Sequence, residues 1–450
     1  MLNLFENFDT DTVDLIRSQN YADLKIPTVV VHDDGFLPDD IDSPIKYYCD
    51  FSSKGKPLYF DKLPLPKFWR ITADANKGEV FDLDKKRAEI HFVNTDNSRQ
   101  IKEVQWLDNE GEISWVNHYN SKGDLFAQTY YNNKQAVLRK YYDRGGNEVM
   151  TYHLVSGDIF LNYQGKKKHF AGLVDFVVDY LQERKYQLDN IFYNSLNVPF
   201  FVSLKLPDNG IDTLFWHEVT GDQLPGNMQY LMKNDTRTKH IIFQKYDEWQ
   251  KWKSILRSND DNVKFDYLGM IYPHPRSNKL RANALIMTNS DNIEKLTELV
   301  TAMPEIHFNI AAVTLMSDKL MAFDKYKNVE LYPSVTQRKV NELITSCDIY
   351  LDINHGSEIL DSVRAAFEQN MLIIGFKDTL HNQQYISDDN VFKNSDIVGV
   401  RDRVVSALSN IKGMKELVDA QRQQAGDMSI ESYKKTFGVL KNERIKEQSR

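Results

Sequence analysis

Apolar and polar residues alternate in three different ways along this chain. Residues 27–31 form a short apolar run bounded by a proline and a turn-rich loop, which is typical of a central strand in a parallel sheet. From about residue 46 to residue 167, short strand-forming runs are separated by Gly and Asn turns about 10 residues apart, and this spacing predicts an antiparallel meander. From about residue 168 the apolar residues take helical spacing and further short strands follow.

The predicted meander carries aromatic residues on both of its faces. In the run at residues 125–131, Phe126 and Tyr130 face one side of the sheet and Leu125 and Tyr131 face the other, because successive side chains of a strand point in opposite directions. An aromatic sheet of this kind needs packing partners on both sides. We therefore expect each face to be covered by the rest of the chain or by another molecule.

Two α/β units flank the meander. The first contains candidate strands at residues 191–193, 200–204 and 213–216, preceded by a helix predicted over residues 171–184. The alternation of strands and helices in the second unit is the signature of a doubly wound parallel sheet with right-handed crossovers. Its candidate strands are residues 283–287, 306–310, 329–331, 348–352 and 371–374.

The sequence therefore predicts an α/β protein with two Rossmann-like doubly wound domains and an inserted antiparallel β-meander domain. The first doubly wound domain is expected over residues 1–45 and 168–261, with the meander at residues 46–167 inserted in a surface loop. The second doubly wound domain is expected over residues 262–425, followed by a helical tail at residues 426–450.

The composition narrows the classes of function. The 450 residues carry 56 Lys and Arg against 64 Asp and Glu, a net charge of -8, which argues against a nucleic-acid-binding protein. The two cysteines, Cys49 and Cys347, make neither a disulfide framework nor a zinc site, and this usage fits a reducing cytoplasm. The sequence lacks an apolar run of the ~20 residues that span a bilayer, and its first residues are acidic where a signal peptide is basic. We therefore expect a cytoplasmic protein.

Two aspartate pairs, Asp33 with Asp34 and Asp39 with Asp40, lie in the loop after the first predicted strand. Hard cations need about six or more oxygen ligands, whereas loops and helix N-caps use aspartate readily. We expect neither a metal ion nor an organic cofactor.

Two α/β units in tandem, without a GxGxxG motif after the first strand, resemble the two-lobed GT-B glycosyltransferases. In these enzymes a pair of glutamates precedes the last strand of the second unit. When Asn370 is aligned with the glycine of the family motif, the two glutamates fall on Ser357 and Ala365, and both are missing. The second unit is similar to the retaining GT-B enzymes in the order of its segments, residues 328–332, 343–351, 355–358 and 369–374.

The resemblance also gives the missing residues a physical role. In GT-B enzymes the first glutamate lies near the donor sugar and the second holds the ribose, while an upstream Arg and Lys hold the diphosphate, whose developing charge needs preorganised cations. At those upstream positions the present chain has Asn289 and Asp291. We therefore expect no catalytic residues. The residues of the expected degenerate donor site are Asn289, His355, Ser357, Glu358 and Ala365.

An active transferase stays open as an alternative. Glu358 is one residue out of register and could replace the first glutamate, and Glu368 could replace the second. His355 and Gly356 precede a predicted helix and could cradle an anion through backbone N–H groups, but a strand-to-helix turn explains them more simply.

The N-terminal part of the chain narrows the resemblance from the GT-B glycosyltransferases in general to a single family. Residues 28–40 are followed by Ser43-Pro44, Tyr47-Tyr48 and a long β insertion, and this order resembles the GtfB family over essentially the whole chain. GtfB proteins are the non-catalytic stabilising partners of the peptide O-GlcNAc transferase GtfA. The resemblance implies a complex that adds N-acetylglucosamine from its UDP sugar to Ser and Thr of serine-rich repeat adhesins, which the accessory Sec system later exports.

For this chain the resemblance implies two partners, a GtfA glycosyltransferase and a serine-rich repeat polypeptide acceptor, and no nucleic acid. It implies a hetero-oligomer, for which two copies of each subunit is one arrangement. It places the complex in the cytoplasm and leaves open a peripheral position on the cytoplasmic face of the cell membrane. A lectin-like protein that binds repeats already carrying sugar is a further alternative.

Aromatic residues of the meander and one histidine are candidates for a surface that binds the acceptor or a partner. Aromatic side chains are enriched in interfaces, and an extended peptide can add to a sheet edge. About half of the aromatic side chains are expected to pack on the α/β domain instead. For His217, a structural role with a hydrogen bond to neighbouring backbone is the simpler explanation. The candidates are Trp106, Trp115, Tyr119, Tyr130, Tyr131, Tyr141, Tyr142 and His217.

Overall fold

The computed structural model describes residues 1–51, 54–74, 76–93, 99–207, 209–256 and 262–447. Its contacts divide the chain into two compact units. The first is made of residues 1–242 and 253–266, and the second of residues 243–252 and 267–449.

The N-terminal sheet has six strands in the order β16-β15-β14-β13-β1-β2. β1 pairs in parallel with both β2 and β13, and β13 pairs in parallel with β14. Every residue of these four strands is buried, as in a parallel sheet covered on both faces. The strands are β1 (Leu2–Phe5), β2 (Thr28–Val30), β13 (Ile191–Tyr193), β14 (Asp212–Trp216), β15 (Thr238–Phe243) and β16 (Lys264–Tyr267).

One predicted strand of the first unit is wrong. Residues 200–204 lie in the helix α4 (Val198–Lys205), because a short apolar run fits a buried helix as well as a buried strand. Pro199 takes one of the first two helical positions, where its fixed φ favours a helix start. The other helices of this part of the chain are α1 (Thr10–Tyr21), α2 (Pro44–Tyr48), α3 (Leu173–Glu183), α5 (Gly226–Lys233), α6 (Tyr246–Leu256) and the short 3-10 helix η1 (Phe60–Lys62).

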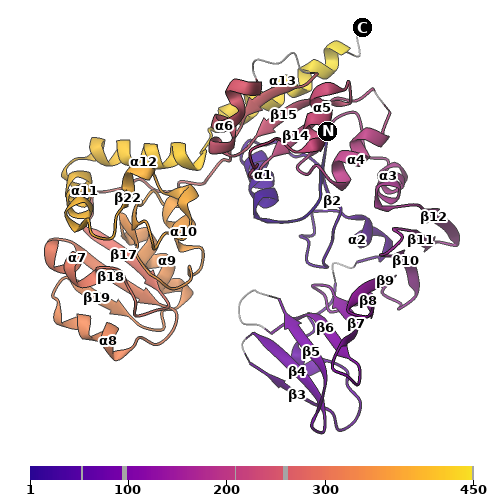
Figure 1. Cartoon of the computed structure of the whole chain (residues 1–450), viewed down its shortest axis with the longest axis horizontal. Coiled ribbons are helices and arrows are strands. Elements are labelled where there is room, and N and C mark those ends of the chain that lie inside the picture. The colour runs from indigo at the N-terminus through magenta and orange to yellow at the C-terminus, as the bar shows by residue number, and fades with distance from the viewer. Residues whose placement is uncertain (52–53, 75, 94–98, 208, 257–261, 448–450) are drawn as a thin grey trace. The chain divides into compact units, whose positions relative to one another are not determined.

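The meander is a ten-stranded antiparallel sheet in which each strand pairs with its neighbour in sequence, and Figure 1 shows the strands following one another in chain order. The strands are β3 (Arg70–Ala73), β4 (Lys77–Asp82), β5 (Lys85–Phe92), β6 (Ile101–Leu107), β7 (Ile113–Tyr119), β8 (Leu125–Asn132), β9 (Gln135–Tyr142), β10 (Glu148–His153), β11 (Ile159–Tyr163) and β12 (Lys166–Phe170).

The two ends of the meander bury opposite faces. On one face, which we call the Trp106 face, Ile90 and Val104 of β5 and β6 are buried under the segment that contains Leu63 and Trp69. The other face, which we call the Glu103 face, is buried at the β9–β12 end, where rings of β11 and β12 pack against rings of α2 and α3. This reversal explains why aromatic residues occur on both faces.

The C-terminal sheet has six strands in the order β19-β18-β17-β20-β21-β22, and all of its neighbouring pairs are parallel. The strand order reverses between β17 and β20, which is the position where open α/β sheets bind ligands. The strands are β17 (Asn283–Thr288), β18 (His307–Ala312), β19 (Val329–Tyr332), β20 (Ile349–Asp352), β21 (Leu372–Phe376) and β22 (Val391–Phe392).

Helices cover this second sheet, and apolar residues of α7, α9, α10, α11 and α12 are buried beside its strands. The helices are α7 (Leu296–Ala302), α8 (Asp318–Met321), α9 (Gln337–Ser346), α10 (Ser362–Glu368), α11 (Ile397–Ser409), α12 (Ile411–Ala425) and α13 (Ile430–Glu447), with the 3-10 helices η2 (Ala322–Lys325), η3 (Gln383–Tyr385) and η4 (Asp388–Asn390). The predicted α/β class, with two parallel sheets and an inserted antiparallel meander, is confirmed.

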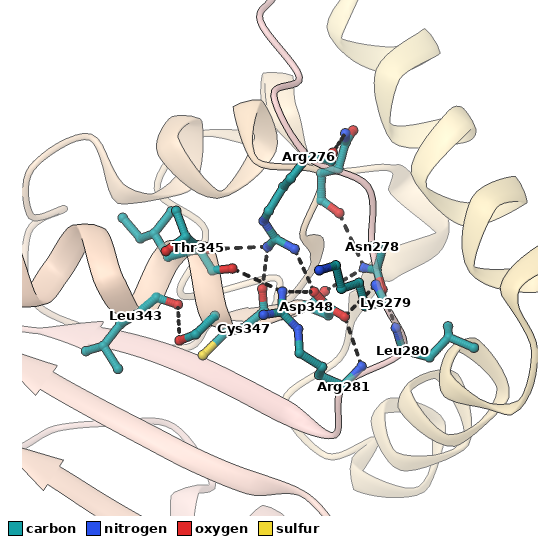
Figure 2. A network of polar contacts seen from close by, with 12 residues as sticks. Arg276, Asn278, Lys279, Leu280, Arg281, Leu343, Thr345, Cys347 and Asp348 are labelled. Carbon is teal, nitrogen blue, oxygen red and sulfur yellow. Dashed lines mark hydrogen bonds and ion pairs between the residues drawn. The ribbon is translucent and has the colours of Figure 1, made fainter.

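The buried carboxylate of Asp348, just before β20, binds residues of the segment that precedes β17. Figure 2 shows Arg276 and Arg281 pointing toward Asp348, whose Oδ1 lies 2.6 Å and 2.7 Å from their guanidinium nitrogens. The backbone N–H groups of Lys279 and Arg281 donate to Oδ2 at 2.8 Å and 2.9 Å. Burial alone would raise the pKa of Asp348, but the hydrogen bonds from the two arginines and the backbone lower it below the usual value.

Within the described part of the chain, every helix is too short or too polar to traverse a lipid bilayer.

Candidate functional site

A polar pocket of about 480 Å³ lies at the carboxyl ends of β1 and β2, between the N-terminal sheet and the meander. The carboxyl edge of a parallel sheet is where α/β proteins bind ligands. Residues of the N-terminal sheet and residues of the meander both line the pocket, so the inserted meander forms one of its walls. The lining residues are Asn7, Phe8, Asp9, His32, Asp33, Asp34, Phe36, Glu103, His118, Phe126, Ala127 and Arg139.

Residues that follow β1 and β2 form one wall of the pocket. Behind this wall, Glu6 is buried, its carboxylate lies 3.6 Å from Nε2 of His32, and it accepts a hydrogen bond of 2.7 Å from Asn197 Nδ2. Burial acts to raise the pKa of Glu6, but hydrogen bonds from His32, Ser195 and Asn197 lower it overall. Glu6 is therefore held ionised and supports His32 at the pocket surface.

The loop after β2 forms the rim of the pocket. It is held by hydrogen bonds within the N-terminal segment and by close packing against the meander. Asp33 accepts hydrogen bonds from the backbone N–H of Gly35 at 2.7 Å and from the Ser43 hydroxyl at 2.5 Å. Gly35 has φ +89°, and a Cβ there would lie 2.8 Å from both the Asn120 backbone and the Phe126 ring. Only glycine fits this close approach, so the loop is fixed against β8.

The opposite wall comes from four successive strands of the meander. His118 Nδ1 lies 3.0 Å from Glu103 Oε1, and its Nε2 lies 2.8 Å from the hydroxyl of Thr129. Arg139 Nε donates to the same hydroxyl at 2.7 Å. The hydrogen bond to His118 lowers the pKa of Glu103 below its usual value, although partial burial opposes this.

The pocket offers hydrogen-bond donors and acceptors of both charge signs beside three phenylalanine rings. Such a lining can donate hydrogen bonds to, and accept them from, the hydroxyl and amide groups of a ligand. Within the described ranges, His, Cys, Asp and Glu side chains form no group of three or more suited to a metal ion. The sequence drew attention to Asp33 and Asp34 in the loop after β2, but only the cross-strand register brings the residues of β6 to β9 beside them.

The aromatic residues predicted to form a surface differ in how deeply their side chains are buried. Tyr119 is buried in the cluster under the Trp106 face, and Tyr141 is buried on the Glu103 face. Tyr131 is half-buried at the end of β8, opposite Ala136. Tyr119 and Tyr141 therefore pack within the chain.

The other four aromatic residues share the Trp106 face. Trp115 stacks on Trp106 with 5.9 Å between ring centroids. The hydroxyls of Tyr130 and Tyr142 both donate to Gln128 Oε1, at 3.0 Å and 2.7 Å. Trp115, Gln128, Tyr130 and Tyr142 are all half-buried, and we call these four residues the Trp115 patch.

His217 follows β14 and is separate from this patch. Its Nε2 lies 4.0 Å from Asp11 of α1, at the same carboxyl edge of the N-terminal sheet as Glu6 and His32. Its Nδ1 is buried and has no hydrogen-bond partner among the described residues.

The predicted donor-site residues lie where the strand order of the C-terminal sheet reverses. The loop after β17 and the loop after β20 pair with each other there, with an isolated bridge between Ile293 and Asn354. His355 N donates to the Asn292 carbonyl at 3.0 Å, and the His355 ring lies 2.6 Å from the Glu294 carboxylate. Polar groups of both loops are thus used in contacts between the loops.

Two predicted donor-site residues are hydrogen-bonded to each other at the same edge of the sheet. Asn289 Nδ2 donates to the Ser357 hydroxyl at 2.8 Å. Asn289 Oδ1 lies only 1.8 Å from the position that a Cβ on Gly356 would take. Where the GT-B resemblance expects a cation for the diphosphate, the chain therefore presents a neutral amide that contacts the loop after β20.

The remaining donor-site candidates lie in α10 and in the segment just before it. Glu358 Oε1 accepts a hydrogen bond of 2.9 Å from the backbone N–H of Val363 in its first turn, and burial raises the pKa of Glu358. Ala365 lies within the helix, and Glu368 at its end pairs with Arg364 at 2.9 Å. Both glutamates thus have structural contacts within the second unit.

A histidine that the sequence did not single out completes this region. His381 Nδ1 lies 2.5 Å from Oδ1 of the buried Asp352, and its Nε2 lies 2.7 Å from the Gly356 carbonyl. The hydrogen bond to Asp352 raises the pKa of His381 to about 9, against the opposing effect of burial. Asp352 ends a predicted strand, so its position was foreseeable, but its partner comes from the loop after the next strand.

Comparison with known proteins gives the family context. Four family models match the chain: the GtfB N-terminal domain (residues 2–48), the GtfB middle domain (69–171), the GtfB third domain (173–255) and the GftB/GlyA-F C-terminal domain (284–421).

Two full-length relatives are UDP-N-acetylglucosamine–peptide N-acetylglucosaminyltransferase stabilizing proteins GtfB. The protein from Limosilactobacillus reuteri subsp. suis is 53% identical over 444 residues, covering 98% of this chain and 100% of the relative. The protein from Streptococcus agalactiae is 39% identical over 446 residues, with 98% and 100% covered.

The fold has a solved counterpart. A chain in the crystal structure of a GtfA/B complex bound to UDP and GlcNAc superimposes with a TM-score of 0.91 and 38% identity, covering 98% of this chain and 100% of that one. The pneumococcal O-GlcNAc transferase GtfA superimposes with a TM-score of 0.53 at 12% identity, covering 98% and 99%, a likeness of fold alone.

Proposed function

Because the chain belongs to the GtfB family of stabilizing proteins of a peptide N-acetylglucosaminyltransferase, we propose that it stabilises a GtfA-type transferase, binds the acceptor polypeptide and does not itself catalyse transfer. The acceptor is a serine-rich repeat polypeptide, and the sugar donor is UDP-N-acetylglucosamine bound by the partner. The alternative of an active transferase would need Glu358 and Glu368 at the donor, and both have other contacts.

The observation that carries this proposal is the crevice at the strand-order reversal of the C-terminal sheet. A departing diphosphate needs Arg, Lys or free helix N-terminal N–H groups. The crevice contains Asn289 and Ser357 hydrogen-bonded to each other, with the contact between His355 and Glu294 beside them. These contacts support a subunit that retained the fold of a transferase without its donor site.

The pocket of the first unit supports the acceptor role. An unmodified serine-rich polypeptide offers hydroxyl and amide groups and little charge. His118, Arg139 and the acidic residues of the pocket can donate to and accept from such groups, and the Phe36 and Phe126 rings can contact the apolar parts of a peptide. We therefore place the acceptor in this pocket.

The Trp115 patch is the part of the chain that we assign to the partner transferase. Half-buried aromatic residues with a hydroxyl or indole N–H are common anchors of protein interfaces. The patch lies on the Trp106 face, away from the face that lines the pocket, so one sheet can bind both molecules. His217 belongs to neither surface, and we assign it a structural role beside Asp11.

The proposal also concerns the oligomeric state of the complex and its location in the cell. The complex contains two copies of each subunit, works in the cytoplasm, and modifies adhesins before their export by the accessory Sec system. Its attachment to the membrane is peripheral, on the cytoplasmic face.

Reconstituted transfer tests the proposed function. The purified full chain with UDP-N-acetylglucosamine and a serine-rich peptide should transfer no sugar, the partner GtfA alone should transfer poorly, and the two together should transfer well. Transfer by the chain alone would overturn the proposal. A matched pair of variants of the chain, Glu358→Gln and Glu368→Gln, should leave the activity of the complex nearly unchanged, whereas a residue of a working donor site would abolish it.

A further inference from the structure

The two faces of the meander differ in chemistry where the sheet extends away from the pocket. On the Glu103 face, residues opposite one another on neighbouring strands form a row from β4 to β8: Lys77, His91, Glu103, His118 and Ala127. Glu103, His118 and Ala127 also line the pocket. The row therefore continues out of the pocket across the sheet.

A second row runs beside the first on the same face. It contains Glu79, Glu89, Gln105, Val116, Thr129 and Arg139, again as directly opposed residues of neighbouring strands. Apart from Val116 and Ala127, every member of the two rows is polar. The polar residues of β4 to β6 are only half-buried, with 44% of the Lys77 side chain and 40% of the His91 side chain exposed.

The charges along the two rows are balanced within the face itself. Lys86 lies 2.7 Å from the Glu79 carboxylate and 2.8 Å from that of Glu89, and Lys77 lies 3.2 Å from Glu89. The Lys86 hydrogen bond holds the pKa values of both glutamates below their usual range, against the opposing effect of desolvation. Two lysines thus neutralise two glutamates, and the surface attracts neither strongly acidic nor strongly basic ligands.

This chemistry differs from that of a protein–protein interface. The centres of such interfaces are depleted of charged residues and enriched in aromatic ones. Trp106, Trp115, Tyr130 and Tyr142 lie on the other face. The Glu103 face instead offers hydrogen-bond donors and acceptors and is continuous with the polar pocket.

We propose that the two rows of the Glu103 face between β4 and β8 form a track that holds the acceptor as an extended, uncharged, hydroxyl-rich segment leading into the pocket. The proposal rests on the proposed function and adds to it the path of the polypeptide and the feature that selects it. Neutral hydroxyl and amide groups can replace water at these side chains without disturbing the internal ion pairs, whereas a charged side chain would meet an opposite charge that is already paired.

The dimensions of the track predict how much peptide it holds. Neighbouring strands lie ~4.8 Å apart, so the path from β4 to β8 measures ~19 Å, which about six extended residues cover at ~3.3 Å per residue. Affinity should therefore rise with peptide length until pocket and track are both filled and change little beyond that length.

Peptide binding to the full-length chain tests the track. Fluorescence anisotropy would compare wild type with His91→Ala and Gln105→Ala, which touch the track but not the pocket, and with the pocket variant Arg139→Gln. The probes are labelled Ser/Thr-rich uncharged peptides of about four and about ten residues, and a long peptide with half of its residues replaced by Glu. The matched control is His169→Ala, a histidine exposed on β12 and paired with Asp158.

The track predicts a specific pattern. Each track variant should bind the long uncharged peptide about fivefold more weakly, with less effect on the short peptide, whereas Arg139→Gln should weaken both. The glutamate-rich peptide should bind weakly to all proteins. The His91→Gln variant, with unchanged thermal unfolding, serves as the second test if His91→Ala does not fold.

Each other outcome overturns the proposal in a distinguishable way. If the track variants bind like wild type while Arg139→Gln binds weakly, the pocket binds the acceptor and the track is wrong. If the track variants lose association with GtfA and retain peptide affinity, the face belongs to the partner protein. If wild type binds none of the peptides, the acceptor role of the proposed function fails together with the track.

Discussion

The side-chain oxygen of Asn289 lies 1.8 Å from the position that a Cβ on Gly356 would occupy. The two residues come from loops that follow β17 and β20, on either side of the strand-order reversal. In an open α/β sheet this position normally receives a ligand. Here the Asn289 side chain lies against Gly356, and its amide donates to Ser357.

This packing makes Gly356 intolerant of a larger residue. Gly356→Ala should lower the free energy of unfolding by about 1 kcal/mol, since Asn289 must move away from the new methyl group. Urea unfolding measures the change. Gly221→Ala is the control, because a Cβ there meets nothing within 4 Å. The double variant Asn289→Ala with Gly356→Ala should remove the clash, and equal destabilisation with and without Asn289 would contradict this account.

The pair of His381 and Asp352 predicts a pH dependence of stability. The pKa of His381 is raised to about 9 in the folded chain from an ordinary value of 6.5. The stabilisation is therefore complete below pH 6.5 and is lost as the pH rises through about 9. This loss amounts to roughly 3 kcal/mol. Urea midpoints measured between about pH 6 and pH 10 should fall for wild type and fall much less for His381→Gln.

The control for this experiment is His169→Gln, since His169 makes an exposed contact with Asp158. Its midpoints should follow the wild-type curve. A His381→Gln protein with the same pH dependence as wild type would show that other groups produce the loss of stability.

The buried carboxylate of Asp348 should be essential for the stability of the second unit. Asp348→Ala leaves two guanidinium groups and two backbone N–H groups without their acceptor. The expected loss in the free energy of unfolding is about 3 to 5 kcal/mol. Denaturant unfolding of this variant should be compared with Asp402→Ala, whose exposed pair with Arg401 predicts a change within about 0.5 kcal/mol. Similar losses in the two variants would contradict a special role for Asp348.

The Trp115 patch predicts a separation of binding from stability. Trp115→Ala and Tyr130→Ala should weaken association with the partner transferase about tenfold or more, as expected for aromatic anchors. Analytical ultracentrifugation of the mixed subunits measures the association. Phe160→Ala, an exposed aromatic residue on β11 outside the patch, should associate like wild type. If the two patch variants only melt at a lower temperature and associate normally, their rings belong to the fold alone.

The sequence allowed the main elements of the fold to be predicted, because they follow from local periodicity. Alternating runs with Gly and Asn turns indicated the meander, and short apolar runs indicated the buried parallel strands. Residues 200–204 show the limit of this method. Their apolar run has no period to distinguish a strand from a helix, and neighbouring packing selects the helix.

The candidate site depends on distances that periodicity does not contain. Alternation predicts that Glu103 and His118 each lie on one face of a strand, but the register between the strands decides that they face each other. The reversal of the covered face along the meander arises from the elements that pack on each end. His381 meets Asp352 only after a turn beyond the next strand. The loops of the donor region were located by resemblance, and their mutual contacts were visible only in the structure.

The central claim is that this chain recognises the acceptor and has lost the use of a nucleotide donor. Isothermal titration of UDP and of an unmodified serine-rich peptide into the purified full-length chain tests both parts in one experiment. The account predicts saturable heat for the peptide and no saturable heat for UDP. Tight UDP binding without any peptide binding would contradict it.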